Sequence, residues 1–145
     1  IAESLADGST RTVHRMGDVG YFDAQGRLWF CGRKTQRVET ASGPLYTEQA
    51  EPVFNTVAGV RRTALVGVGA QGSQRPVLCY ELEPSVADSP AIVAALRAVG
   101  AAHPHLVGIN DFLHHRAFPV DIRHNAKIGR EKLAVWAATQ LEKAR

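Results

Sequence analysis

The stretch "VRRTALVGVGAQGSQRPVLCYELE", residues 60–83, consists of two apolar, β-branched runs separated by small and polar residues. Two such runs on either side of a glycine-containing loop predict a β-hairpin. Within it, "GVGAQG" (67–72) matches the dinucleotide fingerprint GxGxxG. That fingerprint binds phosphate only where a helix follows the glycines, because the helix N-terminus receives the pyrophosphate. Here a second strand follows, so we interpret these glycines as a hairpin turn.

A helix is predicted on each side of this hairpin. Upstream, "TEQAEPVFNTV" (47–57) has apolar residues at helical spacing, with Thr47 as the candidate N-cap. Pro52 lies inside that pattern, so the helix is short or begins later. Downstream, "DSPAIVAALRAVG" (88–100) predicts a helix with Ser89 as the cap and Pro90 at the first helical position.

The remaining elements complete a small domain. "FLHHRAF" (112–118) predicts a third strand ended by Pro119, and a final helix is predicted from about Arg130. One side of that helix carries Leu133, Trp136, Ala137 and Leu141. From residue 36 the order is helix, strand, strand, helix, strand, helix. This order predicts an α+β fold with a short, mostly antiparallel sheet packed by helices.

Before this domain, "VGYFDAQGRLWFCGR" (19–33) predicts another β-hairpin, with Gly26 available for a positive φ in its turn. A loop with a short strand near Val38 follows it. The chain opens without an initiator methionine and in the middle of a motif, as a fragment would, and it shows no signal-peptide pattern.

The composition, with 45% hydrophobic and 21% charged residues among 145, is that of an ordinary globular protein. A net charge of +3 with dispersed basic residues gives little support to nucleic-acid binding. No apolar run is long enough to span a membrane. Cys31 and Cys79 are too far apart in sequence for a CxxC motif, so we expect both to be buried and the compartment to be reducing and cytoplasmic.

No metal site is expected, because the histidines lack the i, i+4 spacing of a helical metal site. His114 and His115 should alternate between the faces of their strand. We expect His124 to pack in a loop, with a substrate contact as the alternative.

Three polar residues each allow two interpretations. Lys127, in "RHNAKIGREK" (123–132), is either a solvated lysine or a cation held to meet an anionic substrate. Asp18 either forms an Asx-type turn or accepts hydrogen bonds from ribose hydroxyls. Arg33 is either a surface cation or a phosphate and ribose ligand.

Three motifs taken together favour the functional interpretations. "GDVGYFDAQGRLWFCGRK" (17–34), "SGPLYTEQAEPVF" (42–54) and "NAKIGREKL" (125–133) occur in the order found in the adenylate-forming superfamily. The chain resembles the carboxyl-terminal part of these enzymes over essentially its whole length. Within the superfamily, "RLWFCGRK" (27–34), "GPLYTEQ" (43–49) and "VDIRHNAKI" (120–128) are most similar to the olefin β-lactone synthetases.

The resemblance assigns roles by position. It implies that Lys127 is the mobile catalytic lysine, that Asp18 and Arg33 bind the nucleotide, that Thr35 is the hinge, and that Gly43 belongs to the loop used in the second half-reaction. Three features depart from the family pattern, namely Thr35 in place of Asp or Lys, Ala126 in place of glycine, and a Pro119 that lies further than usual from the lysine.

The resemblance also implies a division into domains and a reaction. Residues 1–34 would be the tail of a large amino-terminal domain, and residues 35–145 the small mobile domain. With ATP and Mg²⁺, the enzyme would activate a long-chain β-hydroxy fatty acid as acyl-AMP and close it to a β-lactone, with other enzymes of olefin biosynthesis as partners. The chain alone would be inactive. The alternatives are a fatty acyl-CoA ligase and a non-catalytic interaction module.

Overall fold

The centre of the protein is a three-stranded sheet in the order β7-β8-β9, seen here in a computed structural model that describes residues 2–4, 6–12, 16–123 and 127–144. Strands β7 (Val60–Val68) and β8 (Arg75–Leu82) are antiparallel, and β9 (Asp111–His114) runs parallel to β8. The predicted hairpin is thus confirmed, with the glycine-rich stretch at its turn.

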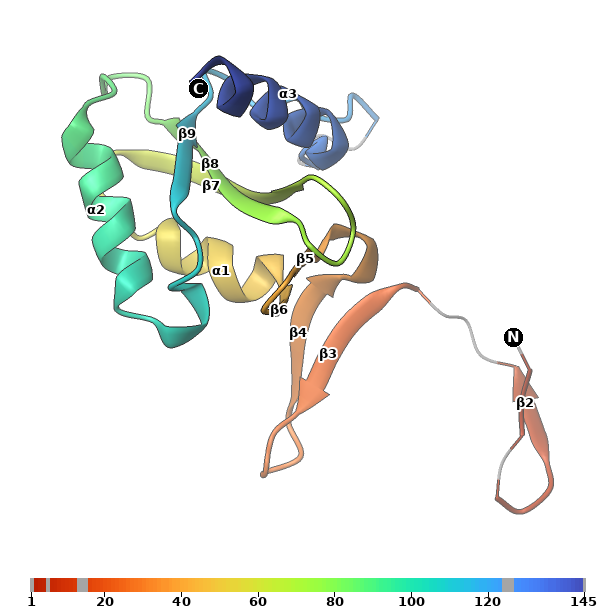
Figure 1. Cartoon of the computed structure of the whole chain (residues 1–145). Coiled ribbons are helices and arrows are strands. Elements are labelled where there is room, and N and C mark those ends of the chain that lie inside the picture. Colours follow the sequence, from red (N-terminus) through yellow and green to blue (C-terminus); the bar gives the residue numbers. More distant parts are fainter. Residues whose placement is uncertain (1, 5, 13–15, 124–126, 145) are drawn as a thin grey trace.

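Helices cover both faces of this sheet (Figure 1). Helices α1 (Thr47–Phe54) and α2 (Pro90–Ala101) pack on one face, and α3 (Arg130–Lys143) packs on the other. Successive strand residues point to opposite faces, so Leu65 joins the α1–α2 core while its neighbour Ala64 joins the α3 core. The predicted α+β fold is confirmed.

The helix boundaries agree with the sequence patterns except at one cap. Helix α1 is short and contains Pro52, as predicted, but its N-cap residue is Tyr46 rather than Thr47. The Thr47 side chain is buried next to Gly32. Ser89 and Pro90 occupy their predicted positions, although the Ser89 hydroxyl makes no capping hydrogen bond.

The third strand ends earlier than predicted, at His114 rather than near Pro119. Beyond it, the backbone N–H of Ala117 donates to Nδ1 of His115, and that of Phe118 donates to the carboxylate of Glu81. These side chains replace the partners that a longer ladder would have supplied.

Among the described residues, three two-stranded hairpins precede the sheet. They are β1 (Ala2–Ser4) with β2 (Thr10–Thr12), β3 (Asp18–Phe22) with β4 (Leu28–Arg33), and β5 (Val38–Thr40) with β6 (Gly43–Leu45). Only β3–β4 was predicted in full, with Gly26 at a positive φ as expected. Short 3-10 helices occur at η1 (Lys34–Gln36) and η2 (Pro104–Leu106).

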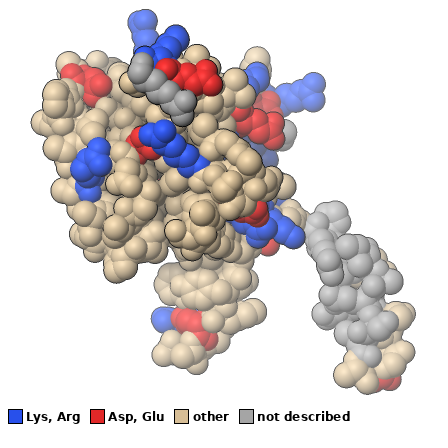
Figure 2. Space-filling model, viewed as in Figure 1, with Lys and Arg blue, Asp and Glu red and all other residues tan. Residues whose placement is uncertain are grey.

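The β3–β4 hairpin extends away from the sheet (Figure 1) and exposes large apolar side chains. These are Tyr21, Phe22, Leu28, Trp29 and Phe30. In the space-filling view, the hairpin is mostly uncharged apart from groups near its tip (Figure 2). The hairpin packs on the rest of the protein at the end opposite its turn, where Cys31 of β4 is buried against α1.

The two cysteines are free and buried, as predicted. None of the helices in the described parts of the chain combines the length and the apolar character needed to cross a membrane.

Candidate functional site

Lys127 lies in the connection between β9 and α3. We call the described residues 119–123 and 127–129 of this connection the lysine loop. An antiparallel bridge between Val120 and Ile128 closes its base. The N–H of Asp121 donates to the carbonyl oxygen of Lys127 at 3.0 Å, and that of Gly129 donates to Pro119 at 2.6 Å. These bonds fix the backbone of Lys127 relative to the start of α3.

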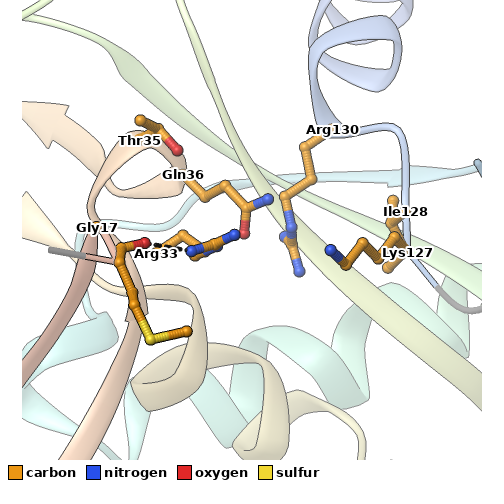
Figure 3. Close-up of a pocket in the computed structure, with 8 residues that line it drawn as sticks. Gly17, Arg33, Thr35, Gln36, Lys127, Ile128 and Arg130 are labelled. Atoms are coloured by element: carbon orange, nitrogen blue, oxygen red, sulfur yellow. Dashed lines mark hydrogen bonds between the residues drawn. The ribbon is translucent and has the colours of Figure 1, made fainter. Parts of the chain in front are cut away.

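The Lys127 side chain borders a cavity of about 510 Å³. Residues from three separate segments line it, namely Met16, Gly17, Arg33, Thr35, Gln36, Lys127, Ile128 and Arg130. Figure 3 shows Lys127, Arg33 and Arg130 pointing into the same space. Three cationic side chains around one cavity favour an anionic ligand.

Two of these cations are already paired with carboxylates. Nη1 of Arg33 lies 3.4 Å from Oδ1 of Asp18 and also donates to the carbonyl oxygen of Met16. Arg130 forms a two-pronged pair with Glu51, at 2.5 and 2.8 Å. Within the described part of the chain, the Lys127 ammonium has no hydrogen bond or ion pair, so its charge is available to a ligand.

A second cavity, of about 690 Å³, continues from the first and shares Thr35, Gln36, Lys127, Ile128 and Arg130 with it. Its remaining lining comes mainly from the lysine loop, the start of α3 and β7. Together the two cavities form a groove between η1 and the lysine loop. The predicted hinge residue Thr35 therefore faces the segment that carries Lys127.

The structure brings the predicted site residues together except for one. Asp18 adjoins the cavity through its pair with Arg33, and Thr35 and Lys127 line it. Gly43 instead lines a different cavity, of about 580 Å³, together with residues of β6, α1 and η2. It adopts a φ of +125°, which a residue with a side chain rarely takes up.

Sequence reasoning missed Gln36, Arg130 and Glu51. Gln36 gave no signal, because a polar residue in a polar loop is unremarkable. Glu51 did give one, since it lies beside Ala50 on the side of α1 that is buried in the structure. A charged residue in such a position requires a partner, and that partner is Arg130.

The histidines take up structural positions where they are described. His114 faces Tyr80 and Asp88, whereas His115 contacts Trp136 in the other core, so the two do alternate between the faces. Burial lowers the pKa of His115. In the described part of the chain, no three His, Cys, Asp or Glu residues are grouped to hold a metal ion. His14, His124, Asn125 and Ala126 lie outside the described residues.

No protein-family model matches the chain. It is 77% identical over 143 residues to an olefin β-lactone synthetase of Stenotrophomonas maltophilia strain K279a. The aligned region covers 99% of this chain and 26% of that protein. It is 72% identical over 142 residues to an olefin β-lactone synthetase of Xanthomonas campestris pv. campestris, covering 97% and 26%. The chain thus spans about a quarter of the length of these relatives.

Solved structures share the fold. The amide bond synthetase McbA of Marinactinospora thermotolerans superposes with a TM-score of 0.70 at 24% identity, over 92% of this chain and 26% of McbA. An ATP-bound RpMatB-BxBclM chimera superposes with a TM-score of 0.72 at 20% identity, over 92% of this chain and 26% of the chimera.

Proposed function

We propose that this chain, like the matching quarter of the olefin β-lactone synthetases to which it is 77% and 72% identical, supplies the catalytic lysine of an enzyme that activates a carboxylic acid as an acyl adenylate. The observation that carries this proposal is the ammonium of Lys127, which has no ion-pair partner among the described residues and faces Arg33 across one cavity. Such a cavity suits a reaction between two anions.

In the first step, a carboxylate oxygen attacks the α-phosphorus of ATP and pyrophosphate leaves. Two negatively charged groups must approach, and charge builds up on the phosphate oxygens. An ammonium placed between them offsets the repulsion and stabilises this charge. Lysine suits the role because it is a compact point charge on a long stem. ATP would enter as its Mg²⁺ complex, with the ion carried by the phosphates.

In the second step, the substrate's own β-hydroxyl attacks the acyl carbonyl carbon. The hydroxyl loses its proton, the bond to AMP breaks, and a four-membered lactone forms. Because the nucleophile belongs to the same molecule as the carbonyl, proximity assists the closure. The substrate class is a long-chain β-hydroxy acid, and other enzymes of olefin biosynthesis would make this acid and consume the lactone.

The domain division is part of the same proposal. Residues 1–34 would belong with the rest of the enzyme, because the β3–β4 hairpin exposes apolar side chains that a further domain could cover. Residues 35–145 would form the domain that carries Lys127, with the hinge at Thr35. Asp18 and Arg33 would bind the nucleotide, and Gly43 would act in the second step, since it lies apart from the lysine cavity.

A fatty acyl-CoA ligase is the second candidate. The chain is 36% identical over 68 residues to a 2-succinylbenzoate–CoA ligase of Arabidopsis thaliana, which covers 46% of this chain. In such an enzyme, the thiol of coenzyme A would replace the β-hydroxyl as the nucleophile. The proposed role of Lys127 would be unchanged.

The test uses a chimera in which this chain replaces the matching quarter of the Stenotrophomonas maltophilia relative. It is supplied with ATP, Mg²⁺ and a long-chain β-hydroxy acid, with and without coenzyme A, while AMP and the organic product are followed by mass spectrometry. A product lighter than the acid by one water, formed without coenzyme A, supports the lactone synthetase. A thioester formed only with coenzyme A supports the ligase, and the absence of AMP from every reaction contradicts both.

A further inference from the structure

Two acidic side chains are buried among the described residues, Glu51 on α1 and Glu81 on β8. They are far apart in sequence and join different networks of hydrogen bonds. Each of them nevertheless accepts a hydrogen bond from a residue immediately next to the lysine loop.

Glu81 holds the residue before the loop. It pairs with Arg62 on the neighbouring strand, with Nε–Oε1 at 2.7 Å and Nη2–Oε2 at 3.2 Å. Its Oε2 also accepts the backbone N–H of Phe118. Burial opposes the ionisation of Glu81, but the bonds from Arg62 and Phe118 outweigh burial and lower its pKa. The carboxylate is therefore ionised at neutral pH and binds Phe118 as a charged acceptor.

Glu51 holds the residue after the loop. Its Oε2 accepts the N–H of Leu65 on β7 at 2.7 Å, and both its oxygens accept from Arg130, the first residue of α3. Arg130 in turn reaches the carbonyl oxygen of Leu65 at 3.4 Å. One carboxylate thus joins α1, β7 and the start of α3.

The loop is consequently fixed on both sides. Phe118 directly precedes the loop residue Pro119, and Arg130 directly follows Gly129. Between them, the bond from Gly129 to Pro119 draws the two ends of the loop together. The backbone of Lys127 is thereby tied to both helical layers of the fold as well as to the sheet.

Stability alone does not require this arrangement. Removing two charges from water is costly, and apolar residues of similar volume often stabilise a core equally well. What bidentate charged hydrogen bonds add is geometric specificity, because they fix the orientation as well as the distance of their partners. Directional support is what a catalytic side chain needs.

We propose that Glu51 and Glu81 are positioning residues, which place Lys127 for adenylation by fixing the two ends of its loop. This inference rests on the proposed function of Lys127. Neither carboxylate is assigned any contact with substrate, and each acts through a neighbour of the loop.

The test compares Glu51→Gln and Glu81→Gln in the chimera described above. Both changes preserve side-chain volume but remove the charge that holds Arg130 or Phe118. A misplacement of about 1 Å costs roughly a hundredfold in rate, so we expect kcat for adenylation to fall about 10- to 100-fold. The KM for ATP should change less than about threefold, because Asp18 and Arg33 are untouched and a contact made only in the transition state affects kcat.

The matched control is Asp111→Asn, which removes another two-pronged pair, with Arg75, at 2.6 Å for both bonds. Neither of these residues lines the groove, so kcat should stay within about twofold of the parent value. An equal loss of kcat in this control, or an unchanged kcat in both glutamine variants, would overturn the inference.

Two further variants separate this inference from the proposed function. If Lys127→Ala leaves adenylation unchanged, the proposed role of the lysine fails first. If Lys127→Ala is impaired but both glutamine variants are fully active, only the positioning role fails. Should Glu51→Gln not fold, Arg130→Lys replaces it, since it keeps a cation but loses the two-pronged geometry; a kcat at least tenfold lower at unchanged KM supports the inference, and an unchanged kcat contradicts it.

Discussion

Asp18 and Arg33 stand directly opposite each other on β3 and β4, with Nη1 of Arg33 3.4 Å from Oδ1 of Asp18. The two side chains are 41% and 45% exposed, respectively, so this ion pair contributes little to stability. The pair instead places a hydrogen-bond acceptor and a donor side by side next to the Lys127 cavity.

Replacing Asp18 by alanine should therefore weaken nucleotide binding without unfolding the protein. Loss of a charged hydrogen-bond acceptor costs about 1.5 kcal/mol or more, which corresponds to a rise of about tenfold in the KM for ATP. The melting temperature should stay within about one degree, as expected for an exposed pair. Steady-state kinetics and a thermal melt of the chimera check both. A large stability loss with unchanged KM would contradict the nucleotide role.

Lys127→Ala should reduce adenylation by two to three orders of magnitude, because one preorganised charged contact contributes about 3 to 4 kcal/mol in the transition state. The measurement is ATP–pyrophosphate exchange by the chimera. Lys143→Ala is the control, since Lys143 is an exposed lysine at the other end of α3. Equal activity of the two variants would contradict the catalytic assignment.

Much of this fold follows from local patterns. The β7–β8 hairpin has two apolar runs around a glycine-containing loop, whereas α2 and α3 have apolar residues at helical spacing, and the structure confirms all three elements. The pairing of Asp18 with Arg33 does not follow from the turn at Gly26 alone, because the register of the hairpin shifts by one residue between Val19 and Gly20. The short strands β5 and β6 are too brief to show a period, and only the position near Val38 was predicted.

The supports of the lysine loop could not be predicted in the same way. Glu51 and Arg130 are separated by 79 positions, and Glu81 and Phe118 by 37. No local period relates residues at such separations, because their contact depends on how the helices pack on the sheet. A charged residue on a buried side of a helix shows only that a partner must exist, not which residue it is.

Gly32→Ala should destabilise the protein and disturb Arg33, which follows it. Gly32 has a φ of +112°, and a Cβ there would lie 2.6 Å from Oγ1 of the buried Thr47. Backbone strain alone costs about 1 to 3 kcal/mol, and the clash adds to it. Gly69→Ala is the control, since Gly69 has a similar φ of +102° but open space around it. Thermal melts of the two variants should show the larger loss for Gly32→Ala, and equal losses would contradict the clash.

The Cys79 thiol should be inert in the native protein. Burial, with a smaller contribution from the negative charge of Glu51, raises the pKa of Cys79 to about 12. At pH 8, roughly one thiol in ten thousand would be ionised, and only the thiolate is nucleophilic. Brief alkylation followed by peptide mass mapping should leave Cys79 unmodified until denaturant is added. Rapid labelling of the folded protein would contradict its placement in the α3 core.

The 145-residue chain alone should not catalyse ATP–pyrophosphate exchange. The described residues place Lys127 beside a cavity whose cations suit an anion, but the chain spans only about a quarter of its relatives. Adenylation also requires a pocket that holds the carboxylate in line with the α-phosphate, since proximity supplies much of the rate. Exchange by the isolated chain should equal that of its own Lys127→Ala variant, whereas the chimera should be active. Lysine-dependent exchange by the 145 residues would contradict the proposed division of the site between two domains.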